Sequence, residues 1–218
     1  MEDSPLLDDY LLSLVGRERP RICFVGTASG DNENYIVRFY RRFNRAQCEP
    51  SHLDLFRRDG RDLTEFARTQ DIIYVGGGNT ANMLAVWRVH GFVDALREAL
   101  DNGTILAGLS AGSICWFESG VTDSFGSELR ALDCLGFLSG SHCPHYDGEP
   151  TRRPAYHRLV AEGMSPGVAA DDSVALHYLD GQLHRTVSSR REARAYRVGM
   201  KHGEVIDMPI EPEYLGVT

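Results

Sequence analysis

The sequence predicts an α/β fold: a three-layer αβα sandwich with a mainly parallel central sheet, followed by antiparallel hairpins toward the C-terminus. Two observations predict it. Strand-like apolar runs alternate with amphipathic helix-like runs through the first two thirds of the chain, an order typical of parallel sheets. The last third instead contains strand-like runs paired around short turns with glycine.

The first elements are predicted from local signals that begin and end helices and strands. Residues 21–26 form an apolar, strand-like run, and residues 32–43 place aromatic side chains at helical spacing. Asp62 is typical of a helix N-cap, and Gly91 and Gly103 are typical of residues that follow a helix end. After residue 43 we expect, in order, a strand at 52–56, a helix at 63–69, a strand at 72–75, helices at 80–90 and 93–100, and a strand leading to Ser110.

The chain after residue 120 is less regular. We expect loops in the Gly- and Ser-rich stretch to residue 140 and at 142–147, and loops of this kind often carry function. A helix is predicted across residues 155–162. Two antiparallel pairs are then predicted, at 173–179 with 183–188 around Asp180-Gly181, and at 195–200 with 204–208 around His202-Gly203.

Composition indicates one globular domain over residues 1–218, with 42% hydrophobic and 25% charged residues. No apolar run approaches the ~20 residues that cross a bilayer, and the acidic start lacks the basic region of a secretory signal. We therefore expect a cytoplasmic protein without a membrane partner. The net charge of −8 disfavours a nucleic-acid partner, because binding phosphates needs a basic face. Five scattered cysteines without a C-x-x-C pair argue against a disulfide framework.

Ser110 is the first candidate for chemistry. It stands between an apolar strand-like run and an apolar helix-like run, with Gly108 and Gly112 two positions to either side. A strand that turns sharply into a helix presents its turn residue at the edge of a sheet, and small flanking residues leave space for the turn. The pattern G-x-S-x-G therefore indicates a nucleophilic serine, although an ordinary strand–helix turn gives the same pattern.

A glycine loop at residues 76–79 is the candidate for binding negative charge. It follows a strand and opens a helix, so its backbone N–H groups can turn outward without a side chain in the way. One of these amides, with the Ala111 N–H, would form an oxyanion hole. The alternative is a dinucleotide loop, since Gly76-x-Gly78-x-x-Ala81 fits the degenerate pattern, but no acidic residue ends a strand about 20 residues later.

A serine nucleophile also needs a base and a carboxylate that orients it. His145, in a loop-like run after Ser110, is the first choice for the base, and His142 is its rival. Asp123 is the first choice for the carboxylate, with Glu118 or Glu128 as alternatives. A metal site at 142–147 is the competing interpretation, although alternation along one extended segment seldom turns every ligand inward. We expect no cofactor and no metal.

Three segments together resemble the peptidase E family of serine peptidases, the aspartyl dipeptidases related to cyanophycinase. These segments are the run 73–80 with its three glycines, the turn Gly108-Leu-Ser-Ala-Gly112 and Pro144-His-Tyr146, in the family's order and at similar separations. The resemblance covers most of residues 20–180. It implies a flavodoxin-like fold similar to the class I glutamine amidotransferases, whose cysteine at this turn is replaced here by serine.

The resemblance also implies roles for individual residues. Ser110 is implied as the nucleophile, His145 as general base and then acid, and Asp123 as the triad carboxylate. The N–H groups of Gly78 and Ala111 are implied as the oxyanion donors. Arg152 is implied to hold the aspartyl side chain of the substrate, with Asn79 assisting and Arg153 as the alternative.

The expected function is therefore a serine exopeptidase acting on dipeptides or short peptides, with Asp-Xaa dipeptides favoured. Glu149, Asp171 and Asp172 are candidates for binding the free amine of the substrate. Two rival functions stay open. An α/β-hydrolase-type esterase would use a histidine nearer the C-terminus, such as His202, and a non-catalytic binding protein would retain Ser110 only for packing. For the oligomeric state, a homodimer stays open.

Overall fold

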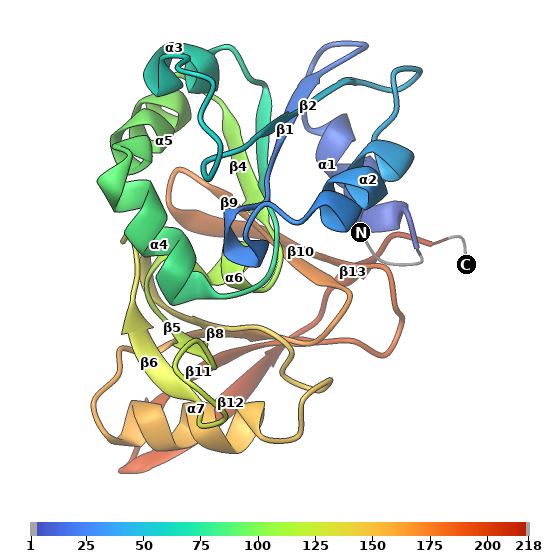
Figure 1. Ribbon diagram of the computed structural model, residues 1–218. Helices are drawn as coiled ribbons and strands as arrows, with labels where there is room; N and C mark the ends of the chain where they lie inside the picture. Colours follow the sequence, from blue (N-terminus) through green and yellow to red (C-terminus); the bar gives the residue numbers. More distant parts are fainter. Residues whose placement is uncertain (1–3, 217–218) are drawn as a thin grey trace. The chain divides into compact units, whose positions relative to one another are not determined.

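The computed structural model describes residues 4–216 and divides them into two compact units (Figure 1). Unit 1 is Tyr10–Ser113, and unit 2 contains residues 4–9 together with residues 114–216. The prediction of a single catalytic domain over 1–218 stays a prediction. Among residues 4–216, no helix has the length and apolar character that crossing a membrane requires.

Unit 1 is built on a four-stranded parallel sheet in the order β2-β1-β3-β4. The strands are β1 (Arg21–Val25), β2 (Glu49–Leu53), β3 (Ile72–Val75) and β4 (Ile105–Gly108). The register pairs Ile22 with Ile72 and Val75 with Gly108. The parallel sheet and the alternation of strands and helices confirm the predicted α/β class.

Helices cover both faces of this sheet (Figure 1). The helices of unit 1 are α2 (Glu33–Arg42), α3 (Leu63–Arg68), α4 (Thr80–Val89) and α5 (Phe92–Asp101), with a 3-10 turn η1 (Thr27–Ser29) and the second half of α1 (Leu6–Ser13). An aromatic core packs α2 against the sheet, in which the Phe24 ring stacks on Phe39. Side-chain caps begin three helices: Asn32 for α2, Asp62 for α3 and Asn79 for α4.

Unit 2 contains two sheets and one long helix. A six-stranded mixed sheet has the order β12-β11-β8-β7-β5-β6, and a three-stranded sheet has the order β13-β10-β9. The elements are β5 (Phe117–Thr122), β6 (Arg130–Asp133), β7 (Leu138–Cys143), α7 (Arg152–Ala161), β8 (Gly167–Ala170), β9 (Val174–Leu179), β10 (Gln182–Ser188), β11 (Ala195–Lys201), β12 (Glu204–Ile210) and β13 (Glu213–Tyr214). Tyr156, Leu159 and Val160 of α7 pack into the buried core of this unit.

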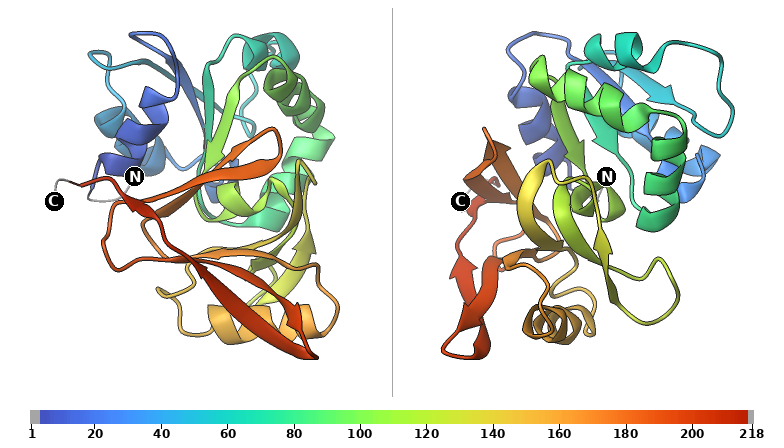
Figure 2. Two further views of the ribbon diagram at one scale, coloured as in Figure 1. Left: turned by 180° about the vertical axis from the view of Figure 1, so that it is seen from behind. Right: turned by 90° about the vertical axis from the view of Figure 1, so that its left-hand side faces the viewer.

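The two predicted hairpins are confirmed, and their turns explain why they could be predicted. Asp180 and Gly181 both have positive φ angles (50° and 74°), as do His202 and Gly203 (53° and 87°). Two central residues with positive φ define the type I′ turn, which matches the twist of the flanking strands. The β11–β12 hairpin is the long red ribbon in the left view of Figure 2.

Several predicted boundaries are wrong. The strand expected at 52–56 is β2 at Glu49–Leu53, and the helix expected at 155–162 begins three residues earlier as α7. Helix α1 and strands β5, β6, β7 and β8 were not predicted. The last four contain many polar or small residues, so their pairing depends on the tertiary structure more than on local pattern.

Candidate active site

In unit 1, Ser110 occupies the turn between β4 and the short helix α6 (Ala111–Ile114). Its φ angle is 53°, in the left-handed region that side-chain-bearing residues rarely adopt. The turn closes because its glycines lack side chains. A Cβ on Gly108 would clash with the carbonyl of Gly112, and one on Gly112 would clash with the carbonyl of Val75. Both positions therefore require glycine, as the sequence pattern predicts.

The glycine loop lies beside Ser110, because a Cβ added to Gly77 would come 3.2 Å from the Ser110 Cβ. Three amides of this loop have protein acceptors: Gly76 with the Val25 carbonyl (3.0 Å), Gly77 with the Tyr35 hydroxyl (3.1 Å) and Asn79 with the Ala28 carbonyl (2.8 Å). The Gly78 N–H has no acceptor in the described part of the chain. Gly78 is thus the loop amide that remains available to an anion.

Gly78 has a φ angle of 139°, and a Cβ there would clash with the Ala28 carbonyl. Only glycine therefore fits this position. The second predicted donor, the N–H of Ala111, opens α6 and has no acceptor within its own helix. The Asn79 side-chain oxygen accepts the Asn82 N–H (2.9 Å), so this predicted substrate contact caps α4.

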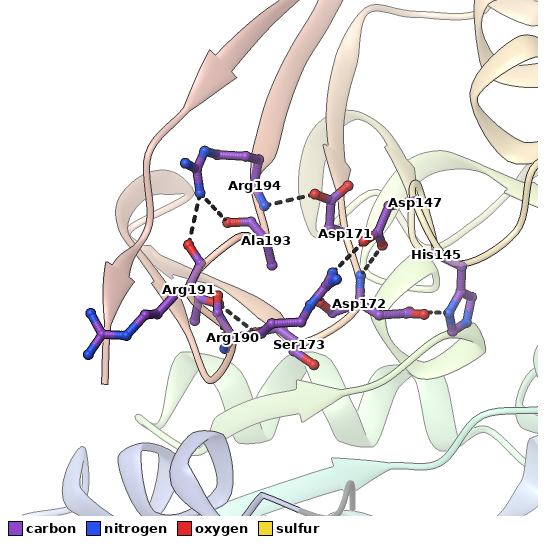
Figure 3. Close-up of polar contacts among 10 residues, drawn as sticks. His145, Asp147, Asp171, Asp172, Ser173, Arg190, Arg191, Ala193 and Arg194 are labelled. Carbon is purple, nitrogen blue, oxygen red and sulfur yellow. Dashed lines mark hydrogen bonds and ion pairs between the residues drawn. The ribbon is translucent and has the colours of Figure 1, made fainter. Parts of the chain in front are cut away.

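In unit 2, His145 follows β7 and also has a left-handed backbone, with φ of 56°. Its Nδ1 lies 2.6 Å from Oδ1 of Asp172 (Figure 3). An ionised carboxylate only accepts hydrogen bonds, so Nδ1 donates and Nε2 is the nitrogen that can take up a proton. This is how a carboxylate holds the imidazole of a catalytic histidine in one tautomer.

The carboxylate beside His145 is that of Asp172 and not that of Asp123, which the sequence predicts. Asp123 is exposed in the loop between β5 and β6, and the structure gives it no contact with His145. Of the alternatives, Glu118 accepts the Gly140 N–H (2.8 Å) and Glu128 binds Arg130 (3.1 Å). The expected pairing with Asp123 is thus corrected.

Strand pairing explains the correction. Strands β7 and β8 are parallel neighbours, with Cys143 paired to Ala169, so the residues after their carboxyl ends meet at one edge of the sheet. His145 and Asp172 are such residues. The sequence does contain a signal for this carboxylate, because Asp171 and Asp172 directly follow an apolar strand. For these two residues the sequence predicts only a role in binding the substrate amine.

His142, the rival base, is a packed residue. It is buried, its Nδ1 lies 2.8 Å from the Val168 carbonyl oxygen, and its ring stacks on Phe117. Burial lowers the pKa of His142 to about 4, which keeps the ring neutral. His202, the base that an esterase would need, lies in the turn of the β11–β12 hairpin.

Comparison with known proteins decides the family. The sequence model described as Peptidase family S51 matches residues 1–186. The chain belongs to peptidase family S51. It is therefore a peptidase of the serine type, and the resemblance to peptidase E is confirmed.

Curated relatives of this S51 peptidase agree with the assignment. The Bacillus subtilis protein named "Uncharacterized peptidase YgaJ" is 54% identical over 98% of this chain and 93% of its own length. The "Peptidase E" of Haemophilus influenzae is 43% identical over 57% of this chain and 61% of its own length. A crystal structure of a peptidase from an acI-B1 Actinobacterium has a TM-score of 0.73 at 17% identity, covering 95% of this chain and 88% of that one. At that identity the likeness concerns the fold.

The two arginines considered for substrate binding both contact carboxylates of this S51 peptidase. Arg152, with a side chain only 4% exposed, binds Oε2 of Glu149 through Nε (2.7 Å) and donates to the Val121 carbonyl (2.9 Å). Arg153 pairs with Asp207 (2.6 Å) and lies over the Tyr146 ring. Arg152 therefore also stabilises the start of α7.

The competing metal interpretation has no support in the geometry. Within residues 4–216, no group of three or more His, Cys, Asp or Glu side chains is arranged to hold a metal ion. Cys143, one member of the 142–147 segment, is buried in the core of unit 2, and burial raises the pKa of its thiol to about 12.

Proposed function

We propose that this S51 peptidase is a cytoplasmic serine exopeptidase that hydrolyses dipeptides or short peptides, preferably with an N-terminal aspartate, through an acyl-enzyme at Ser110. One observation carries the proposal. The left-handed Ser110 lies beside a glycine loop in which the Gly78 N–H has no protein acceptor among the described residues. A serine on a sharp strand–helix turn with an open amide nearby is the arrangement of a nucleophile elbow and its oxyanion hole.

In the first step, Ser110 Oγ attacks the scissile carbonyl while His145 Nε2 takes the hydroxyl proton. Asp172 stabilises the imidazolium through Nδ1. The carbonyl oxygen becomes an oxyanion and accepts hydrogen bonds from the N–H groups of Gly78 and Ala111. The C–N bond then breaks, and the imidazolium gives its proton to the leaving amine.

In the second step, water replaces the released amine. His145 takes a proton from water as its oxygen attacks the acyl carbon, and the same two amides bind the second oxyanion. The ester bond to Ser110 breaks and the proton returns to Ser110 Oγ. The products are the N-terminal residue and the shortened peptide or free amino acid.

Substrate preference is assigned to Arg152. A chain with a net charge of −8 disfavours an anionic substrate unless a nearby cation offsets the charge, and a guanidinium binds carboxylates with defined direction. For the proposal to hold, a substrate carboxylate must share Arg152 with Glu149 or displace it. Replacing Arg152 by Gln should then raise KM for Asp-Leu much more than for Leu-Leu. An equal loss on both peptides would assign Arg152 to stabilising α7 alone.

The proposed reaction is tested with purified dipeptides Asp-Leu, Glu-Leu and Leu-Leu without added metal. We expect hydrolysis of Asp-Leu and a loss of ~10⁴- to 10⁶-fold in kcat for Ser110→Ala, because triad members act as one unit. Ser127→Ala is the matched control, since Ser127 is an exposed serine in a loop of unit 2. A Ser110→Ala variant that keeps more than about a tenth of the wild-type rate would contradict the assignment.

A further inference from the structure

The backbone of Asp172 is held at both of its polar atoms by side chains (Figure 3). Its N–H donates to Oδ1 of Asp147 (2.9 Å), and its carbonyl oxygen accepts from a terminal nitrogen of Arg190 (3.1 Å). The same Arg190 nitrogen also binds Oδ2 of Asp147. Three residues from three separate segments thus close a ring of hydrogen bonds through the backbone of Asp172, the residue whose carboxylate meets His145.

This ring fixes a turn that the local chain would not hold by itself. Ser173, directly after Asp172, has a φ angle of 72°, which is uncommon for a residue with a side chain. Its carbonyl oxygen accepts the Ser189 N–H (3.0 Å). Asp172 is also confined on its other side, because a Cβ on Gly148 would clash with its Oδ2. The turn is therefore determined by its surroundings.

Arg190 is in turn held by its own segment, residues 188–194. Its N–H donates to the Ser188 hydroxyl (3.0 Å), which lies 3.1 Å from the Ser173 carbonyl oxygen. At the end of the segment, Asp171 and Arg194 exchange two hydrogen bonds. In these the Arg194 N–H donates to the Asp171 carboxylate (2.8 Å) and the Asp171 N–H donates to the Arg194 carbonyl (2.9 Å). Residues 188–194 follow the part of the chain that the S51 family model matches.

Electrostatics favour a charged pair here. Burial raises the pKa of Asp147, but the hydrogen bonds from Arg190 and from the Asp172 amide outweigh burial and lower that pKa below its ordinary value. The Asp147 side chain is about one third exposed and that of Arg190 slightly more. A pair with this exposure adds little stability by itself, so its effect is mainly on the geometry of the residue that it holds.

We propose that Arg190 and Asp147 are positioning residues, which act as one clamp on the Asp172 backbone and thereby keep the Asp172 carboxylate on Nδ1 of His145. The proposal rests on the proposed function, in which His145 and Asp172 serve Ser110. Release of the clamp lets the carboxylate rotate away, so the imidazolium formed during acylation loses its partner. Displacements of about 1 Å in such groups can cost up to ~10²-fold in rate.

The test compares Arg190→Gln, Asp147→Asn and the double variant with the wild-type chain. We expect each single variant to lower kcat about 10- to 100-fold with KM within about twofold, because chemistry is affected more than binding. The double variant should lose no more than the worse single one, since both residues act through one ring of contacts. Arg190→Lys, which can still donate, should recover part of kcat.

Arg191→Gln is the matched control, because it removes the same positive charge from the same segment. The Arg191 guanidinium lies over the Tyr214 ring and not on the Asp172 backbone. The proton on His145 Nδ1 supplies a readout that needs no substrate. Its downfield NMR resonance should be present in the wild type and Arg191→Gln, and broadened or lost in Arg190→Gln and Asp147→Asn.

Three results would contradict the clamp proposal. They are a kcat of Arg190→Gln within twofold of the control, a double variant in which the kcat losses of the two single variants multiply, and an unchanged His145 Nδ1 proton resonance in the single variants. Failure of the proposed function gives a different result. No dipeptide would then be cleaved by the wild-type chain, and the resonance alone would still decide whether the clamp holds Asp172.

Discussion

At the residue scale, two left-handed side-chain-bearing residues matter most. Ser110 and His145 have φ angles of 53° and 56°, one in each unit. Such backbones persist only where the surroundings determine them, and they cluster at functional sites. Around Ser110 the surroundings are glycines that no other residue can replace. At His145, the imidazole is fixed by the Asp172 carboxylate.

Gly148 offers a sharp test of the Asp172 position. Its φ angle is not in the left-handed region, so alanine is compatible with its backbone, but the added Cβ would displace the Asp172 carboxylate. We expect Gly148→Ala to lower kcat about 10- to 100-fold while the free energy of unfolding changes by less than about 1 kcal/mol. Steady-state kinetics and urea unfolding measure the two effects.

Gly16→Ala is the control for that variant, since a Cβ at Gly16 meets nothing within 4 Å. It should leave both kinetics and stability nearly unchanged. A Gly148→Ala enzyme with more than half of the wild-type kcat would show that the carboxylate does not need its observed position.

At the element scale, strand pairing decides which residues meet. The predicted carboxylate, Asp123, differs from the observed one, Asp172. The pairing of β7 with β8 brings His145 and Asp172 together, and no local sequence pattern encodes that pairing. Strand β7 itself, Leu-Ser-Gly-Ser-His-Cys, has a polar sequence and yet a buried second half. The hairpin turns and the Asp62 cap could be predicted because their chemistry is local.

His142 shows how one side chain joins three of these strands and makes stability depend on pH. It lies on β7, contacts the Val168 carbonyl of β8 and stacks on Phe117 of β5. Because burial lowers its pKa from 6.5 to about 4, the unfolded chain takes up this proton at higher pH than the folded chain. Its contribution to stability is complete above pH 6.5 and is lost as the pH falls toward 4.

We expect that loss to reach about 3 kcal/mol over this window, because each pH unit contributes about 1.4 kcal/mol. Urea unfolding of the full chain between pH 7 and pH 4 measures it. His142→Gln does not titrate but can still donate to the Val168 carbonyl, so its free energy of unfolding should fall less steeply than that of the wild type. Equal slopes for the two chains would contradict the assignment.

At the scale of the whole molecule, the candidate groups divide between the two units. Ser110, Gly78 and Ala111 belong to unit 1, whereas His145, Asp172 and Arg152 belong to unit 2. The sequence predicted the fold class, the Ser110 turn and its glycines correctly. The turn could be predicted because it needs small residues at fixed positions close to the serine in the sequence. It gave the wrong partner for His145 and no sign of the Arg190 clamp, because both depend on contacts between residues distant in the chain.

The central proposal is that Ser110 is activated by His145 and Asp172. Labelling by a serine-directed organophosphate, with the modified residue identified by mass spectrometry, tests it most directly. We expect the wild-type chain to be modified at Ser110, and His145→Ala to react about 10³-fold or more slowly, with Asp172→Asn also strongly slowed. Labelling elsewhere in the chain, or at the same rate in His145→Ala, would contradict the proposal.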